Sequence, residues 1–192
     1  MVALAKETLA PYIERDQANV IQGSIQEASH LFCQEQSEGT ASIQFDLVLC
    51  HAVIEWLADP QAAIGSLTEW LKPDGYLSLL YYNRNSLLIK NLLRGNFYRV
   101  KRAVIESQWG GDPGSLTPLS PIDPEALNAW VLAENLEVVK TVGIRAFYDY
   151  MPKATQEDRD IEDILELEHL LSEQEPFISM SRYIYSVLKV SR

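Results

Sequence analysis

The stretch that decides the fold is Phe45–Gly75, FDLVLCHAVIEWLADPQAAIGSLTEWLKPDG. It begins with an apolar run that is short enough for a strand and apolar enough for burial on both faces of a parallel sheet. Asp59 and Pro60 then indicate a helix start, because Asp caps free backbone N–H groups and Pro is tolerated in the first turn. The Lys72–Gly75 turn ends the helix, and Tyr76 opens a second apolar run. The stretch predicts a strand, a helix and a parallel strand joined by a right-handed crossover.

Length and charge exclude several classes of protein. The 192 residues are enough for one domain with a sizeable core. A net charge of −11 argues against a generally basic nucleic-acid binder. The three histidines are far apart, so no metal site is predicted, and Cys33 and Cys50 are expected to be reduced core residues of a cytoplasmic protein. No apolar run approaches the roughly 18 residues of a membrane span, so we expect no membrane partner.

Several strings of this sequence resemble known methyltransferases. Asp46–Leu49 (DLVL) is similar to the fourth strand of class I S-adenosylmethionine-dependent methyltransferases, and Leu71–Gly75 (LKPDG) is similar to the turn before their fifth strand. The longer strings HAVIEWLADP, YYNRNSLLIKNLLRGNF, GIRAFYDY and QEPFISMSRYIYSV resemble the bacterial tRNA 5-carboxymethoxyuridine methyltransferases, and together they cover most of the chain. The resemblance implies an α/β fold with a Rossmann-like sheet that is mostly parallel and contains one antiparallel strand.

The resemblance also implies an activity. That family uses S-adenosyl-L-methionine to esterify the carboxylate of 5-carboxymethoxyuridine at the wobble position of tRNA, so an enzyme with this cofactor and with tRNA as its partner is implied. A carboxylate has a pKa of about 4 and is already ionised at neutral pH, so the reaction needs no general base. Catalysis would then depend on orientation and on the exclusion of water, and no catalytic residue is predicted.

The front of the chain departs from the family pattern. Class I methyltransferases open with a strand and a GxGxG-type loop that admits the cofactor, and no such loop precedes Asn19. We therefore expect residues 1–192 to form a single, incomplete methyltransferase domain that lacks strands 1 and 2 and binds S-adenosylmethionine weakly. Asn19–Gly23 is a candidate for the third strand. The outer edge of the strand in Phe45–Cys50 would be exposed, which predicts association through this sheet edge.

The resemblance assigns three residues to the cofactor. His51 ends the central strand, where open α/β sheets hold their ligands, and the family has a cofactor-contacting histidine at this place. Ile25 and Gln26 occupy the place that borders the adenine. The alternatives are a histidine that only packs and hydrogen-bonds within the fold, and an ordinary helix start at residues 25 and 26.

Four residues are candidates for the substrate pocket. Tyr82 and Asn83 leave the second strand at its carboxyl end, on the expected rim of the active site. Arg145 and Arg182 lie in strand-like segments, where an arginine is costly to bury unless it meets a carboxylate. That carboxylate is either an internal Asp or Glu, or the carboxylate of the substrate, which a guanidinium binds through two parallel hydrogen bonds.

Residues 84–122 are predicted to be an insertion that consists of a basic helix and a loop rich in Gly and Pro. Between Arg84 and Ile105 the sequence has no acidic residue, and Phe97 and Tyr98 lie among its basic residues. This pattern suits phosphate contacts together with base stacking, although a solvated amphipathic helix is the alternative. The RNA-binding candidates are Lys90, Arg94, Arg99, Lys101 and Arg102.

Two other functions stay open at this point. A small-molecule methyltransferase on the same fold would not need the basic tract and would not retain tRNA at low salt. A non-catalytic remnant or interaction module would bind neither S-adenosylmethionine nor a nucleoside. The acidic run Glu157–Glu175 does not separate these functions, because it is expected to be a solvated helix face.

Overall fold

The structure, a computed structural model, describes residues 2–25, 44–110, 118 and 120–191. The chain divides into two compact units, Met1–Ile43 and Gln44–Arg192. The second unit contains every strand of the described sheet, so it is the unit that positions the candidate site.

The first unit is built on helix α1 (Val2–Ile13). Residues 19–23, which were predicted to form a strand, are irregular, so that prediction is wrong. A strand needs a neighbour for its backbone N–H and C=O groups, and the described residues of this unit supply none. Ile25 is partly exposed, whereas Gln26 and Cys33 lie outside the described residues.

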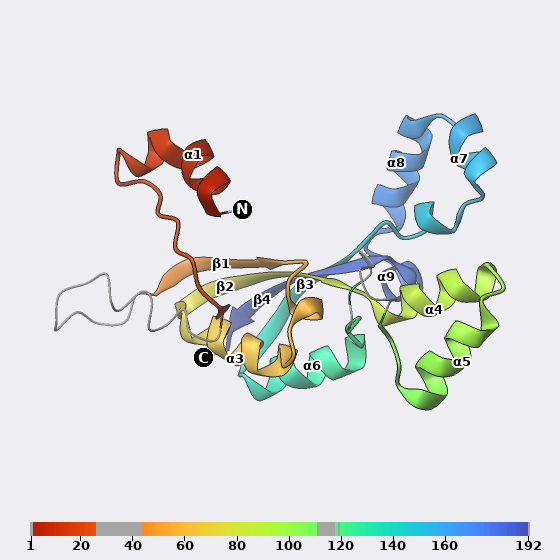
Figure 1. Cartoon of the computed structure of the whole chain (residues 1–192), viewed down its shortest axis with the longest axis horizontal. Helices are drawn as coiled ribbons and strands as arrows, with labels where there is room; N and C mark the ends of the chain where they lie inside the picture. Colours follow the sequence, from red (N-terminus) through yellow and green to blue (C-terminus); the bar gives the residue numbers. More distant parts are fainter. Residues whose placement is uncertain (1, 26–43, 111–117, 119, 192) are drawn as a thin grey trace. The chain divides into compact units, whose positions relative to one another are not determined.

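A four-stranded sheet forms the centre of the second unit (Figure 1). Strands β1 and β2 are parallel, whereas β4 is antiparallel to both β2 and β3. Three strands therefore run in one direction and β4 runs in the other, which confirms the expected mostly parallel sheet with an antiparallel strand. The spatial order β1-β2-β4-β3 is the order expected for strands 4, 5, 7 and 6 of a class I methyltransferase. The strands are β1 (Phe45–His51), β2 (Leu71–Tyr82), β3 (Leu136–Ile144) and β4 (Tyr183–Val190).

The predicted strand–helix–strand unit is present. Helix α3 (Pro60–Glu69) joins β1 to β2, and its N-cap Asp59 accepts a hydrogen bond from a backbone N–H of the first turn at 2.9 Å. Strand β2 begins at Leu71, earlier than predicted, because Leu71 already pairs with Phe45 ahead of an irregularity in the register. Gly75 is required next to this irregularity, since a Cβ there would lie 2.9 Å from the Phe45 carbonyl oxygen.

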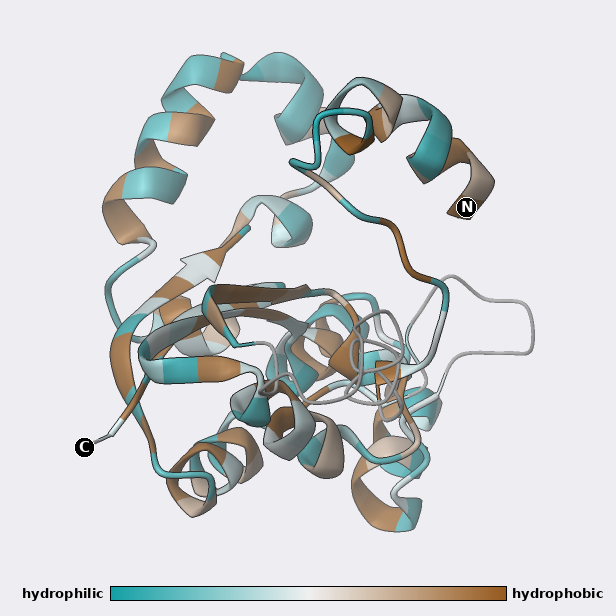
Figure 2. Cartoon of the chain, turned by 90° about the vertical axis from the view of Figure 1, so that its left-hand side faces the viewer, coloured by the Kyte–Doolittle hydropathy of each residue, from teal (hydrophilic) through white to brown (hydrophobic). Residues whose placement is uncertain are grey.

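The two faces of the sheet differ in how they are covered. Helices α3 and α6 (Pro124–Ala133) lie along one face (Figure 1). Leu77 and Leu79 of β2 are fully buried. Successive side chains of a strand point to opposite faces, and on the other face Leu47 and Leu49 of β1 are 53% and 63% exposed. Apolar residues dominate the strands (Figure 2), so the described residues of this unit leave part of an apolar surface uncovered.

Two helices follow β2, namely α4 (Arg84–Leu93) and α5 (Phe97–Glu106). The chain then returns to the end of β2. Asn83 and Ile122 form a parallel bridge, and the Ile122 N–H donates to the Tyr82 carbonyl oxygen at 2.9 Å. The two ends of the basic segment are thus held together, and the division of the chain into a domain with an insertion at residues 84–122 stays a prediction.

The acidic run near the end of the chain forms two helices instead of one. Helices α7 (Lys153–Asp158) and α8 (Ile161–Leu171) are separate, because Asp160 starts a new helix by accepting from the Glu162 N–H at 3.0 Å. Three short elements complete the second unit: η2 (Ile54–Trp56) after β1, η3 (Tyr148–Tyr150) after β3, and α9 (Phe177–Met180) before β4.

Candidate functional site

A pocket of about 360 Å³ lies where β1 and β2 end and α4 and α5 follow. Ala52, Glu55 and Trp56 contribute to its lining from the segment after β1, and Tyr82 contributes from the end of β2. Parallel strands end at the same edge of a sheet, which is where open α/β sheets hold their ligands. This hollow, which we call the basic pocket, therefore occupies the position expected of an active site.

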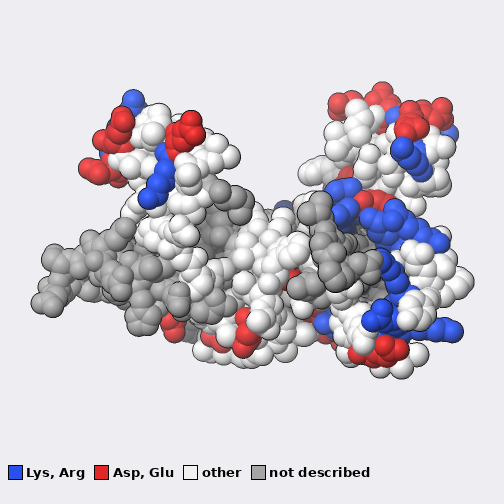
Figure 3. All heavy atoms as spheres, viewed as in Figure 1, with Lys and Arg blue, Asp and Glu red and all other residues white. Residues whose placement is uncertain are grey.

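Positive charge dominates the basic pocket. Lysine and arginine side chains gather over α4 and α5 (Figure 3), although the whole chain carries a net charge of −11. Burial and the nearby Arg182 guanidinium lower the pKa of Lys90. The nearby positive charge that makes the ammonium form of Lys90 less stable would also attract an anionic ligand. The cationic residues of the described lining are Lys90, Arg94, Arg99, Arg102 and Arg182.

Four of the five predicted RNA-binding residues thus line one pocket, and Lys101 is the exception. Lys101 lies exposed on α5. Arg102 lies over the Tyr98 ring, 5.8 Å from its centroid, and its Nε is 3.7 Å from a Glu106 carboxylate oxygen. Phe97 and Tyr98 are 59% and 73% exposed, so both rings are accessible for stacking. A role of these residues in RNA binding stays a prediction.

Aromatic rings border the same pocket. Trp56, Tyr82, Trp109 and Tyr183 belong to its lining. The Arg182 guanidinium lies over Tyr82 and Tyr183, at 5.8 and 5.5 Å from the ring centroids. Such stacking orients a guanidinium and leaves its edge accessible for hydrogen bonds. Sequence reasoning identified only Tyr82, because the two tryptophans lie in distant segments that share no periodic pattern.

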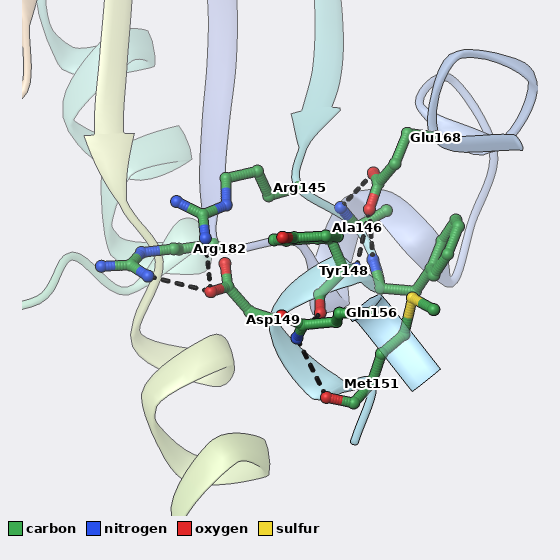
Figure 4. Close-up of polar contacts among 9 residues, drawn as sticks. Arg145, Ala146, Tyr148, Asp149, Met151, Gln156, Glu168 and Arg182 are labelled. Carbon is green, nitrogen blue, oxygen red and sulfur yellow. Dashed lines mark hydrogen bonds and ion pairs between the residues drawn. The ribbon is translucent and has the colours of Figure 1, made fainter. Parts of the chain in front are cut away.

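Arg145 and Arg182 meet at one carboxylate (Figure 4). The Asp149 Oδ1 atom accepts from Arg145 Nη2 at 2.6 Å and from Arg182 Nη1 at 3.0 Å. The internal partner that the sequence left open therefore exists. Burial alone would lower the pKa of Arg182, but the attraction of Asp149 outweighs it, so this pKa is raised.

The cluster of Arg145, Arg182 and Asp149 carries a net positive charge. Two guanidinium groups share the single charge of Asp149, whose side chain is only 8% exposed. The buried Nε of Arg182 finds no hydrogen-bond partner in the described part of the chain. Arg182 lines the basic pocket, whereas Arg145 lines a second hollow of about 370 Å³ between β3 and α8.

The turn that carries Asp149 is held by a residue that sequence reasoning missed. The Glu168 carboxylate of α8 accepts from the backbone N–H groups of Ala146, Phe147 and Tyr148 at 2.6, 3.0 and 2.8 Å (Figure 4). Three successive N–H groups on one carboxylate form an anion-binding concavity. The expectation that the whole acidic run is a solvated helix face is therefore wrong at Glu168. The other acidic residues around Glu168 gave no indication in the sequence that this one binds backbone N–H groups.

His51 is exposed at the end of β1. Its Nε2 lies 2.9 Å from the Ser78 hydroxyl, which donates to the Tyr185 hydroxyl at 3.1 Å. The Tyr185 ring also meets the imidazole edge-on, with 5.9 Å between the ring centroids. These contacts fix the imidazole while leaving it accessible. Its predicted contact with a cofactor stays a prediction.

Asn83 is placed differently from its neighbour Tyr82. It is fully buried and caps α4 by accepting from the Asn85 N–H at 3.0 Å. Its amide donates to the carbonyl oxygens of Ser179 and Ser181 at 2.9 and 2.8 Å. The polar groups of Asn83 are thus used within the protein, and its predicted contact with the substrate stays a prediction.

The acidic residue of the described pocket lining is Glu55, which lies in η2 and is 1% exposed. Burial raises the pKa of Glu55, although hydrogen bonds from the backbone N–H groups of Glu55 and Tyr82 to its carboxylate act in the opposite direction. Burial, assisted by the Glu55 charge, raises the pKa of the Cys50 thiol to about 11. Cys50 is therefore a protonated, unreactive thiol at neutral pH.

Membrane spans and metal clusters are both absent from the residues that the structure describes. The helices among these residues are all too short or too polar to cross a membrane. The described His, Cys, Asp and Glu side chains form no group of three or more that could hold a metal ion.

The sheet order and the pocket at the carboxyl ends of β1 and β2 define a class I methyltransferase fold. A family model described as a methyltransferase domain matches residues 6–141, which is more than half of the chain. The chain therefore belongs to the S-adenosylmethionine-dependent methyltransferases.

The chain is also similar to individual members of this family. It is 36% identical over 140 residues to the tRNA 5-carboxymethoxyuridine methyltransferase of Escherichia coli strain K12. The match covers 73% of this chain and 52% of that relative, and the enzyme of E. coli O157:H7 matches equally. The chain thus spans about half the length of the curated relatives it matches.

Solved structures share the fold at low sequence identity. An S-adenosylmethionine-dependent methyltransferase of Thermotoga maritima superposes with a TM-score of 0.52 at 14% identity, covering 96% of this chain and 70% of that one. The protein PKMT2 of Rickettsia typhi, solved with S-adenosylhomocysteine, superposes with a TM-score of 0.52 at 13% identity. The match covers 97% of this chain and 41% of that one. At such identities these similarities show the fold and leave the substrate open.

Proposed function

We propose that this chain takes part in the S-adenosylmethionine-dependent methyl esterification of 5-carboxymethoxyuridine at the wobble position of tRNA. The observation that carries the proposal is the basic pocket, where cations and aromatic rings meet in an otherwise acidic chain. Such a lining suits a flat, anionic group that belongs to a polyanion. The substrate named for the E. coli relative supports this choice. With tRNA as the substrate, the cytoplasm is the proposed location.

Arg182 is the residue that we assign to the substrate carboxylate. It lines the basic pocket, stacks on Tyr82 and Tyr183, and keeps an Nε without a partner among the described residues. A carboxylate is ionised at neutral pH, so this chain has no proton to remove from it. The task of Arg182 is then to orient the carboxylate, and the aromatic rings exclude water around it.

His51 fits a role in holding the cofactor. S-adenosylmethionine supplies the methyl group when it is bound. The imidazole of His51 is exposed at the carboxyl end of β1 and is fixed by Ser78 and Tyr185, which suits contact with a ligand across that end of the sheet. Ile25 and Gln26 are proposed to border the adenine, as the family resemblance implies.

The exposed part of the basic segment supports tRNA over a small substrate. Phe97, Tyr98 and Ile105 of α5 are 59%, 73% and 76% exposed, next to arginines that line the pocket. A substrate that fits within about 360 Å³ would not reach these residues. A polynucleotide would reach them, because its phosphates and bases continue beyond the bound nucleoside.

Methyl transfer tests the proposed function. The protein expressed from its own gene is incubated with S-adenosylmethionine carrying a labelled methyl group and with tRNA that contains 5-carboxymethoxyuridine. The label is expected in the methyl ester of that nucleoside and is released by mild alkali. A tRNA with 5-methoxyuridine at the same position is the matched control and should accept none. Label on another nucleoside, or only on small carboxylic acids, would overturn the proposal.

We also propose that the second unit associates through the outer edge of β1. From Leu47 to His51, the described strand pairing of β1 is with β2 alone, and Leu47 and Leu49 are exposed beside the outer edge. An unpaired edge next to an apolar face is a template for pairing with another segment. Sedimentation should show association that depends on concentration and that Leu49→Lys weakens. If the wild type and the Leu49→Lys variant associate equally, this proposal is wrong.

A further inference from the structure

One buried carboxylate stands among the cations of the basic pocket. Glu55 is 1% exposed, belongs to the pocket lining, and follows directly after β1. Its Oε2 atom has no hydrogen-bond partner among the described residues. A buried carboxylate oxygen without a donor is costly, so its retention calls for an explanation.

The fold offers backbone donors to the Glu55 carboxylate, but the described residues place none within hydrogen-bonding distance of Oε2. The backbone N–H groups of Glu55 and Tyr82 hydrogen-bond to the carboxylate, which satisfies an N–H of β2 beyond the end of β1. A neutral glutamine could accept these hydrogen bonds through its amide oxygen at a smaller desolvation cost. Hydrogen bonding to the backbone would therefore be met by either glutamate or glutamine at this position. It does not explain why the side chain is a carboxylate with a second, unpaired oxygen.

The lining limits what Oε2 can bind. The lysine and arginines of this pocket supply donors for the anionic and carbonyl groups of a ligand. A carboxylate adds the opposite capability, since an ionised carboxylate only accepts hydrogen bonds. The matching ligand group is an N–H or O–H that lies on the same molecule as an anionic group. A uracil base has such a group, the imide N3–H, between two carbonyl oxygens.

We infer that Glu55 Oε2 accepts a hydrogen bond from the N3–H of the uracil ring in the nucleoside that enters the basic pocket. This inference rests on the proposed function and adds a specificity-determining residue to it. Cytosine presents a lone pair at N3 in place of the N–H, so it would face the carboxylate with an acceptor. A buried polar group left unpaired by the wrong ligand gives strong discrimination.

Paired RNA ligands test the inference without relying on a variant. An RNA hairpin with 5-carboxymethoxyuridine in its loop is compared with the same hairpin carrying the N3-methyl derivative. The phosphate contacts are common to both, so they cancel in the ratio of the two Kd values. The wild-type chain is expected to bind the N3–H hairpin about 10- to 150-fold more tightly, as for the loss of a hydrogen bond to a charged group.

The variant Glu55→Gln separates the hydrogen bond from steric exclusion of the added methyl group. A clash would persist in the variant, whereas the hydrogen bond to the charged oxygen would be lost, so the ratio should fall below about threefold. Glu69→Gln, an exposed position on α3, is the matched control and should keep the wild-type ratio. Thermal unfolding of each variant confirms that it is folded.

Three results would overturn the inference. The first is a wild-type ratio near one, and the second is a ratio that Glu55→Gln leaves unchanged. The third is a 2′-deoxy hairpin that loses affinity in the wild type but not in Glu55→Gln, because the donor would then be a ribose hydroxyl. If the N3-methyl hairpin is bound and methylated normally, the inference about Glu55 is wrong and the proposed function still holds. If neither hairpin binds, the proposed function fails as well.

Discussion

The two hollows whose arginines share Asp149 have nearly the same volume and different linings. The basic pocket measures about 360 Å³ and contains five cationic side chains in its described lining, among them Arg182. The second hollow measures about 370 Å³ and lies between β3 and α8, where Val142, Ile144 and Leu165 contribute apolar side chains. Volume therefore does not indicate which hollow is the site. The cluster of cations and aromatic rings supports the basic pocket as the proposed site.

Asp149 binds one arginine from the lining of each hollow. Its Oδ1 accepts from both Arg145 and Arg182, yet only Arg182 lines the basic pocket. Arg145 lies over the Tyr148 ring at 5.6 Å on the side of the second hollow. One ion cluster thus joins an arginine of the basic pocket to an arginine of the second hollow, and matched variants can test whether the two arginines have different roles.

The largest effect is expected from Arg182→Lys. Lysine keeps the positive charge but lacks the planar fork of a guanidinium, so methyl transfer should fall about 10- to 150-fold. Arg145→Lys, the matched change at the other side of Asp149, should stay within about threefold of the wild-type rate. Thermal unfolding of both variants serves as the control. Equal loss of activity in the two variants, or full activity in both, would abolish the distinction between the hollows.

The next effect concerns the turn that places Asp149. Glu168→Gln removes the charge that three backbone N–H groups share, so the free energy of unfolding in urea should fall by roughly 1.5 to 3 kcal/mol. Glu166→Gln, two positions away and exposed on the same helix, should change it by less than about 0.5 kcal/mol. If the two variants unfold at the same urea concentration, Glu168 does not organise the turn.

A smaller effect is expected in the salt dependence of tRNA binding. Arg94→Ala and Arg99→Ala alter the basic pocket, whereas Lys101→Ala alters an exposed residue outside its lining. Removing one ion pair with a phosphate should reduce the slope of log K against log salt by about 0.7 to 0.9. Filter binding across a salt series should show this reduction for the two arginines and a smaller one for Lys101, which lies on the exposed part of α5 that the RNA is proposed to reach. The reverse order would place the RNA away from the basic pocket.

The smallest effect concerns stability and pH. Burial raises the pKa of Glu55, so the folded state holds this proton at pH values where the unfolded chain, with a pKa of about 4.3, has released it. Between these two pKa values stability falls as pH rises, and above the folded pKa the penalty is complete. Glu55→Gln should therefore raise Tm at neutral pH on the order of 2–4 °C, the equivalent of about 1 kcal/mol at this size.

The pH profile provides the control for that last prediction. The gain in Tm from Glu55→Gln should shrink as pH falls through the raised pKa of Glu55, because the wild-type carboxyl is then protonated and neutral as well. Glu69→Gln should show no such dependence. A gain that is constant with pH would mean that ionisation of Glu55 carries no cost in the folded protein.

Local sequence predicted the central unit well and the edges of the fold poorly. The Asp59 cap, the helical spacing after it and the DLVL run each act within a few residues, so β1, α3 and β2 were predictable. The strand expected at residues 19–23 failed, because a strand depends on a neighbour that its own residues do not specify.

The sequence by itself determined the class of protein, the basic segment and the residues at the carboxyl ends of β1 and β2. Tertiary structure alone decided how the site residues combine. The register of β3 and β4 pairs Ile144 with Tyr183, and this places Arg145 beside Arg182. Asp149 and Glu168 accept hydrogen bonds from donors that are distant in the sequence. Glu55 is distinguished by its burial. The physical reason is that periodicity and capping are local, whereas charge compensation and desolvation depend on what the fold brings within a few ångströms.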